Sequence, residues 1–106
     1  MTTTTHLSRA PQLTRHEARQ RLEHERNSRL AQLRAIEESA PHADKNLEAA
    51  QTAAILRVLE EIDAASRRLT DGTYGTCNSC QTVIPVERLE ILPYVRFCVG
   101  CQQRTS

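Results

Sequence analysis

Aromatic side chains are scarce in this chain of 106 residues. Tryptophan is absent, and the aromatic residues are Tyr74, Tyr94 and Phe97. Aromatic side chains normally supply much of the buried area of a core. Because they are so few here, and only 39% of the residues are hydrophobic, a single sizeable globular core is not expected.

The chain also lacks a long hydrophobic run and an excess of charge of one sign. No stretch reaches the ~20 apolar residues of a membrane-spanning helix, and threonines stand where a signal peptide would carry its apolar segment. The 14 Lys and Arg against 13 Asp and Glu give a formal charge of +1. This small net charge argues against bulk electrostatic attachment to nucleic acid or to an acidic membrane. The lack of a membrane span and of a signal-peptide segment leads us to expect a cytoplasmic protein.

Residues 14–39 have the periodicity of an amphipathic helix. Thr14 and Glu17 form a candidate capping box at its start, and nothing breaks the helix before Ser39. Its apolar stripe is narrow, so we expect it to pack against one other helix. Residues 1–13 carry four consecutive threonines and no apolar period, and we expect them to form a disordered tail.

A second amphipathic helix is predicted after a short reversal at about residues 40–45. Pro41 disfavours helical geometry in the residue before it, and Asp44 can cap the new helix. The second helix has a wider apolar face, and Gly72 follows its end. The two helices predict an antiparallel hairpin, or coiled coil, over residues 14–69.

Facing apolar stripes set the expected register of this hairpin. With the turn near residue 42, partners have numbers that sum to about 84, which places Leu22 beside Ile62 and Arg21 near Asp63. Charge agrees with this pairing, because the first helix is rich in arginine and the second in acids. We expect a narrow rod of about 39 Å that is buried on one face only.

All four cysteines lie near the C-terminus, in two C-x-x-C pairs separated by 17 residues. This spacing is typical of a zinc site, because each C-x-x-C turn presents two sulfurs to one metal. The predicted ligands are Cys77, Cys80, Cys98 and Cys101. Four thiolates fill the tetrahedral coordination of Zn²⁺ and leave no position for an activated water, so we predict one structural zinc ion and no enzyme.

Other uses of paired cysteines fit the chain less well. A thioredoxin-like redox site needs a βαβ context, and a disulfide framework needs secretion. The apolar residues between the cysteine pairs are too few to hold a fold alone, so folding and zinc binding are expected to be one event. Four thiolates and Zn²⁺ add −2 to the formal charge of +1, giving −1, which argues against a DNA-binding finger.

The cysteine pairs belong to a longer pattern. It runs Gly72-Thr73-Tyr74-Gly75-Thr76-Cys77-Asn78-Ser79-Cys80, then Ile84, then Arg88-Leu89, Pro93 and Cys98-Val99-Gly100-Cys101-Gln102. This pattern resembles the DksA/TraR C4-type zinc-finger family. The resemblance implies a mainly α protein, with a helical hairpin in front of a finger module at residues 70–106 that ends in a short helix. The resemblance also implies that six further residues of the motif are structural: Gly72, Tyr74, Gly75, Arg88, Leu89 and Pro93.

The resemblance also implies a function. Members of this family are transcription regulators that bind RNA polymerase directly, without contacting DNA, and insert the hairpin into the secondary channel. The finger would hold the base of the rod, and a monomer is expected. The alternative is a zinc-stabilised adaptor that binds a different protein.

Some positions depart from the family pattern. Gln81 stands where most members have glycine, which tests whether that turn needs a left-handed residue. Of the acids in the family's Asp-x-x-Asp-x-Ala tip motif only Asp44 remains, as a candidate for an effect on the polymerase or as a helix cap. The bases that some members present to the alarmone ppGpp correspond here to Glu61, Leu92 and Gln102, so cooperation with ppGpp is not expected.

Overall fold

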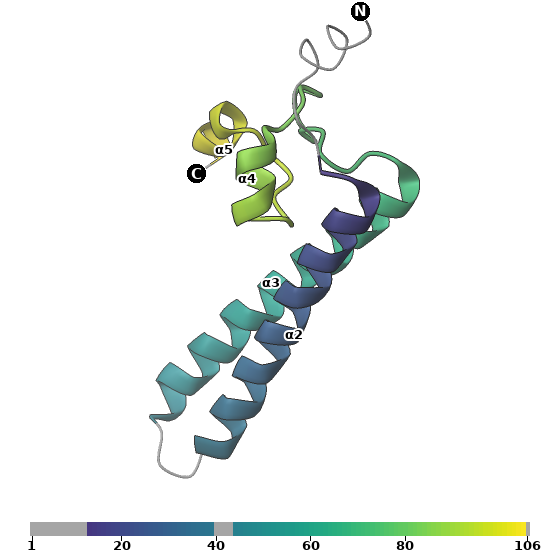
Figure 1. Ribbon diagram of the computed structural model, residues 1–106. Coiled ribbons are helices and arrows are strands. Elements are labelled where there is room, and N and C mark those ends of the chain that lie inside the picture. Colours follow the sequence, from purple (N-terminus) through teal and green to yellow (C-terminus); the bar gives the residue numbers. More distant parts are fainter. Residues whose placement is uncertain (1–12, 40–43, 106) are drawn as a thin grey trace, which may run out of the picture.

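The protein is a helical hairpin with a small module beside its base. In the computed structural model, α2 (Arg15–Ser39) and α3 (Lys45–Asp71) lie antiparallel and side by side (Figure 1). The short helices α4 (Val86–Ile91) and α5 (Val99–Thr105) lie near the end of the hairpin that is remote from the connection between α2 and α3. The molecule extends 65 × 30 × 21 Å. This arrangement confirms the predicted mainly α fold.

The structure describes residues 13–39 and 44–105. The predictions of a disordered N-terminal tail and of a reversal at the hairpin tip fall largely on residues 1–12 and 40–43, which lie outside the described residues. Within the described part, no helix combines the length and the apolarity that crossing a membrane requires.

A capping box starts α2, as the sequence predicts. The backbone N–H of Glu17 donates to Thr14 Oγ1 at 3.0 Å, and the N–H of Thr14 donates to Glu17 Oε1 at 2.9 Å. These reciprocal bonds satisfy two amide groups near the helix start. The bond from the Thr14 backbone is the main reason that the pKa of the Glu17 carboxyl is lowered from its ordinary value.

Asp44 and Gly72 delimit α3. The Asp44 carboxylate accepts hydrogen bonds from the backbone N–H groups of Asn46 at 2.8 Å and Leu47 at 3.1 Å, so Asp44 is an N-cap. At the other end, Gly72 has a φ of 85°, and its N–H donates to the carbonyl of Arg68. A left-handed residue after the last turn is the helix ending for which glycine is preferred.

The hairpin core lies at its base, beside the finger module. Its buried members are Ala18, Leu22, Ile62, Ala65 and Leu69. Leu22 and Ile62 share this cluster, as the expected register requires, and Tyr74 and Tyr94 of the module pack against it. Between residues 23 and 58, no described residue is buried, so the outer part of the rod has no closed core.

The ion pairs across the hairpin differ from the expected register. Asp63 pairs with Arg26 at 3.0 Å, whereas the guanidinium of Arg21 lies 3.7 Å from Glu90 of α4. Side chains lean toward the N-terminus of their own helix, so the α2 partner of Asp63 stands nearer the tip than a Cα register indicates. The position of α4, which places Glu90 near Arg21, is not visible in helix periodicity.

Candidate metal centre

Two short turns carry the four cysteines. In the first turn, Cys77 N–H donates to Thr82 O at 2.8 Å and Gln81 N–H donates to Cys77 O at 3.0 Å. In the second, Gln102 N–H donates to Cys98 O at 2.9 Å, which fixes the start of α5. Backbone hydrogen bonds within each turn therefore hold its two cysteines in place.

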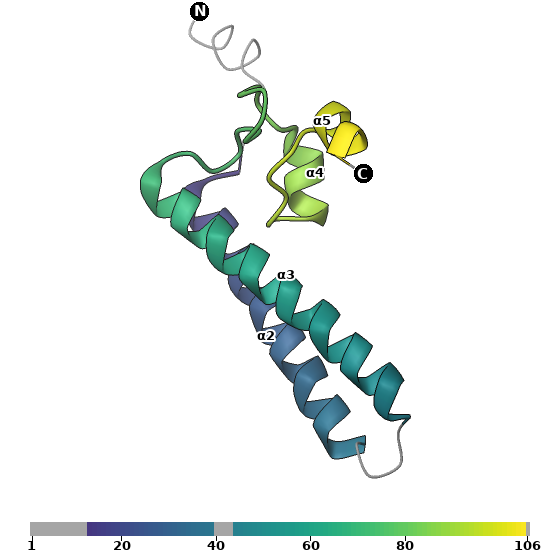
Figure 2. The ribbon, with the colours of Figure 1, turned by 180° about the vertical axis from the view of Figure 1, so that it is seen from behind.

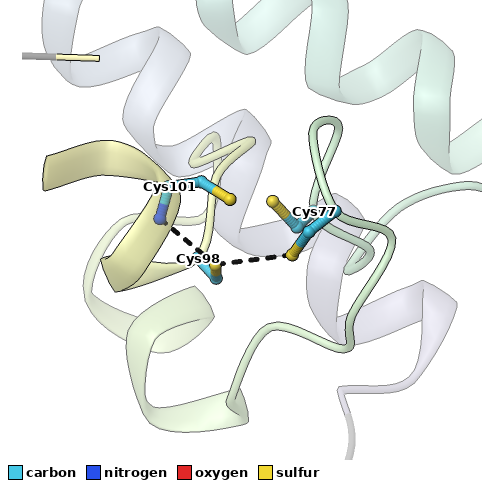
Figure 3. Close-up of side chains that lie close together, drawn as sticks. Cys77, Cys98 and Cys101 are labelled. Carbon is cyan, nitrogen blue, oxygen red and sulfur yellow. Dashed lines mark hydrogen bonds between the residues drawn. The ribbon is translucent and has the colours of Figure 1, made fainter. Parts of the chain in front are cut away.

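The four Sγ atoms converge on one point. The sulfurs of Cys77, Cys80, Cys98 and Cys101 all lie within 4.8 Å of one another. Those of Cys80 and Cys98 are 3.7 Å apart, and Figure 3 shows the thiols of the two turns facing each other. Zn–S bonds of about 2.3 Å in a tetrahedron separate the sulfurs by about 3.8 Å. The set fits one Zn²⁺, which confirms the predicted four-cysteine zinc site.

The four thiols differ in burial and in acidity. Cys77 and Cys101 are buried, whereas Cys80 is exposed. Backbone N–H donors, that of Cys80 foremost, lower the pKa of the Cys77 thiol to about 6, and burial raises the pKa of the Cys101 thiol to about 11. Zinc binding at neutral pH must therefore displace a proton from Cys101.

Groups around the ligands also contact the sulfurs. The hydroxyl of Thr82 lies 3.0 Å from Cys80 Sγ, and the backbone N–H of Cys101 lies 3.5 Å from Cys98 Sγ. Arg104 Nη2 donates to Cys101 Sγ at 3.0 Å. Sequence reasoning missed Arg104, although its position three residues after Cys101 on one helix could have indicated the contact.

A small apolar cluster surrounds the cysteine turns. Its buried members are Cys77, Ile84, Leu89, Val95 and Cys101. Two of the five are thus metal ligands themselves, which supports the expectation that this module folds together with its metal.

Gly75 and Leu89, two of the family-motif residues, meet inside this cluster. Gly75 has a φ of 86°, in the left-handed region that favours glycine, and an added Cβ would lie 3.7 Å from Leu89 Cδ1. Its carbonyl accepts the N–H of Ile84 at 2.8 Å. Leu89, at 5% exposure, fills the space over this turn.

Further motif residues brace the module internally, and an arginine of α3 joins it to the hairpin. Tyr74 Oη donates to the carbonyl of Pro93 at 2.7 Å, and Arg88 Nε donates to the carbonyl of Phe97 at 3.4 Å. Arg68 of α3 donates from Nη2 to the carbonyls of Tyr94 and Val95, both at 3.5 Å. Sequence reasoning missed Arg68, because its partners are backbone atoms of a segment distant in sequence.

Gln81 occupies a left-handed position after the second cysteine. Its φ is 64°, and it is the non-glycine residue with positive φ in the described part of the chain. Its side-chain Nε2 donates to the carbonyl of Asn78 at 3.1 Å. The turn therefore requires the conformation for which glycine is best suited, and glutamine adopts it.

Asp44 is far from the metal centre. It lies at the start of α3, at the opposite end of the hairpin from the zinc module (Figure 2). The structure thus supports its role as a helix cap and leaves its carboxylate exposed at the tip end of the rod.

One pocket contains the three positions that the family resemblance compares with ppGpp-binding residues. Glu61, Leu92 and Gln102 line a pocket of about 570 Å³ between α3 and the module. Arg88 and Arg96 line it too, and Arg96 pairs with Glu61 at 3.5 Å. The acid predicted to repel a phosphate is thus beside an arginine that it partly neutralises.

Fold and site define a class of protein, a two-helix rod that carries a four-thiolate zinc module at its base. A sequence model of the prokaryotic dksA/traR C4-type zinc finger matches residues 72–106. Residues 72–106 therefore carry the C4-type zinc finger of the DksA/TraR family.

Curated relatives match part of this chain. General stress protein 16O of Bacillus subtilis (strain 168) is 47% identical over 45 residues, which are 42% of this chain and 28% of that protein. The RNA polymerase-binding transcription factor DksA of Buchnera aphidicola subsp. Schizaphis graminum is 27% identical over 67 residues, which are 63% of this chain and 44% of that protein. The chain spans less than half the length of the curated relatives that it matches.

A solved structure shares the whole architecture. It is that of the RNA polymerase binding protein and transcriptional regulator Dks from Chlamydia trachomatis, with 23% identity and a TM-score of 0.50. The match covers 90% of this chain and 93% of the Chlamydia chain. At this identity, the likeness shows the common fold.

Proposed function

We propose that the protein is a non-enzymatic transcription regulator that binds RNA polymerase directly. It acts as a monomer without contacting DNA: the hairpin enters the secondary channel, and the zinc module holds the base of the rod against the polymerase. The names of two similar proteins, from Buchnera and Chlamydia, describe RNA polymerase binding. A zinc ion with four thiolate ligands has no open position for substrate, which supports a role in binding.

The lack of a closed core in the outer half of the hairpin is the observation that supports this proposal most strongly. No described residue between 23 and 58 is buried, and Leu47 and Leu56 are 58% and 48% exposed. A pair of helices without a closed core gains little stability from its own packing. A partner that encloses the rod would bury these leucines. The 27 residues of α3 span about 40 Å, so such a partner needs a deep, narrow channel.

Asp44 gives the rod a carboxylate at its tip end. A carboxylate brought near catalytic Mg²⁺ changes the electrostatics of the metal and its substrate. We assign to Asp44 an effect on initiation rather than on affinity, because the sides of the hairpin and the zinc module supply the larger contact area.

A binding titration with purified cognate RNA polymerase, combined with transcription in vitro, tests the proposal. The expected result is saturable binding of one protein per polymerase and a change in initiation. Asp44→Asn should bind with nearly unchanged affinity, because asparagine is an equally good N-cap, yet have a weaker effect on initiation. Asp71→Asn, the same change at the other end of α3, is the matched control and should behave as the unmodified protein.

Other outcomes contradict the proposal. Absence of polymerase binding together with retention of a different protein would favour the adaptor alternative. Salt-sensitive retention on DNA would reassign the protein to nucleic-acid binding. An unchanged effect of Asp44→Asn on initiation would reduce Asp44 to a helix cap.

A further inference from the structure

We propose that Arg104 provides a fixed positive charge for the zinc–thiolate centre and slows the loss of the metal. This inference concerns retention of zinc and does not depend on the proposed binding to RNA polymerase. It rests on a direct contact, on the burial of the sulfur contacted, and on the charge of the centre.

The contact follows from the geometry of α5. Arg104 and Cys101 are three residues apart on this helix, so their side chains share a face. Arg104 Nη2 donates to Cys101 Sγ at 3.0 Å. The guanidinium passes beside Gly100, where an added Cβ would be 4.0 Å from Arg104 Nη1. A Cβ at this distance would be in ordinary van der Waals contact, so the arginine packs against the Gly100 backbone without crowding.

Cys101 is the ligand for which a charged donor matters most. It is 1% exposed, so water cannot stabilise its thiolate. Cys77 is equally buried, but backbone N–H groups, that of Cys80 foremost, donate to its sulfur. Cys80 is exposed, and its sulfur meets the neutral hydroxyl of Thr82, while Cys98 accepts a neutral backbone N–H. Among these described contacts to the sulfurs, the one from Arg104 brings a full positive charge.

The charge of the centre explains the expected direction of the effect. Four thiolates and Zn²⁺ carry a net charge of −2, and the guanidinium reduces the local sum to −1. A charge-assisted hydrogen bond to a thiolate is stronger than a neutral one. It stabilises the deprotonated sulfur that binds metal, and it reduces repulsion among the four sulfurs. Groups that contact metal ligands in this way typically change metal affinity by about 10–100-fold.

Transfer of zinc from the full-length protein to an excess of a chromogenic chelator tests the proposal. Arg104→Gln should release zinc about tenfold faster or more, and Arg104→Lys should be intermediate, because it restores the charge without the planar fork. Arg57→Gln, which removes an exposed arginine from α3, is the matched control for net charge and should release zinc at the rate of the unmodified protein.

A spectroscopic measurement separates the charge from a merely structural role. With Co²⁺ in place of zinc, the sulfur-to-metal charge-transfer band of Arg104→Gln should move to longer wavelength, since the thiolate electrons lose a stabilising cation. The bands that report tetrahedral coordination should stay unchanged.

Two results would overturn the proposal. One is an unchanged rate of zinc release in Arg104→Gln. The other is faster release with an unmoved charge-transfer band and no rescue by Arg104→Lys. If Arg104→Gln fails to take up metal, Arg104→Lys decides: uptake of metal with a release rate and a band close to those of the unmodified protein supports the proposal, and failure of Arg104→Lys to take up metal rejects it.

Discussion

Gln81 shows how a single residue limits the stability of the first cysteine turn. Its φ of 64° brings the Cβ of an L-residue close to the following carbonyl, at a cost of roughly 1–2 kcal/mol. The bond from its side chain to the Asn78 carbonyl at 3.1 Å is exposed and offsets only part of this cost.

Gln81→Gly should therefore stabilise the zinc-loaded protein, by about 1 kcal/mol. Urea denaturation with saturating zinc measures the difference. Ser79→Gly is the control: Ser79 has no positive φ, so glycine there adds only freedom to the unfolded chain and should destabilise slightly. Equal destabilisation by the two glycines would contradict the assignment of strain to Gln81.

Tyr74, which packs against the hairpin core, makes the stability of the protein depend on pH at alkaline values. Its hydroxyl donates to the Pro93 carbonyl at 2.7 Å, and burial raises the pKa of Tyr74 from 10.0 to about 12. Below pH 10 the phenol is neutral in both the folded and the unfolded chain. Between pH 10 and 12 the unfolded chain ionises first, so the stability that the neutral phenol contributes is lost over this range.

Tyr74→Phe should lower the free energy of unfolding by about 1 kcal/mol at pH 8, through loss of the hydrogen bond. As the pH rises from 10 toward 12, the difference between Tyr74→Phe and the unmodified protein should shrink, because phenylalanine does not ionise. Urea denaturation at a series of pH values measures this difference. A difference that is constant with pH would contradict the account of Tyr74.

At the scale of the elements, the hairpin is stable at its base and weak toward its tip. Leu22 is 2% exposed and sits in the base cluster, whereas Leu30, eight residues further along α2, is only half-buried. Deleting a buried leucine side chain costs its transfer energy and leaves a cavity. At a half-buried position, the neighbours and solvent fill the space.

Leu22→Ala should therefore destabilise the protein by about 3 kcal/mol, and Leu30→Ala by about 1 kcal/mol. Because both variants make the same change in the same helix, each controls the other in a urea titration. Amide hydrogen exchange should show the same gradient, with protection that decreases from the base of α2 toward Ser39. Equal costs for the two variants would contradict a core confined to the base.

The ends of the two long helices could be predicted from the sequence, whereas the contacts between the hairpin and the zinc module could not. Thr14 with Glu17, and Asp44 with Gly72, act through contacts within a few residues, so local signals suffice to place the ends of α2 and α3. The bond from Arg68 to the Tyr94 carbonyl spans 26 residues, and no local pattern reports it.

At the scale of the whole molecule, the metal ligands could be predicted because C-x-x-C spacing fixes a local turn geometry. The pairing of Arg96 with Glu61 and the position of Arg104 depend on how helices pack and on side-chain direction. Such arrangements are set by tertiary structure, so they became visible only with the structure.

Cooperation with ppGpp is a property of the assembled molecule that we predict to be absent. The pocket that holds Glu61, Leu92 and Gln102 has an acid at a position where a polyanion needs a cation. Arg96 is paired with Glu61, and Arg88 donates to the Phe97 carbonyl, so both arginines of this pocket already have partners.

In vitro transcription with the cognate polymerase tests this prediction. This protein and ppGpp, applied alone and together, should give a combined effect equal to the product of their separate effects. A combined effect well above the product would show that the arginines exchange their partners for phosphate. Glu61→Gln, which removes the repelling charge, is the variant in which cooperation is expected to increase.

Photocrosslinking from the tip end of the rod shows whether the hairpin enters the secondary channel of RNA polymerase. A benzophenone amino acid replaces Lys45, the exposed first residue of α3, and in a matched variant Thr70, which is exposed near the base of the same helix. Mass spectrometry then maps the crosslinked residues of the polymerase. We expect the Lys45 position to crosslink to segments that line the secondary channel, and the Thr70 position to crosslink to its outer rim or to nothing. Crosslinks from the Lys45 position to the outer surface of the polymerase, or none at saturating binding, would contradict this expectation.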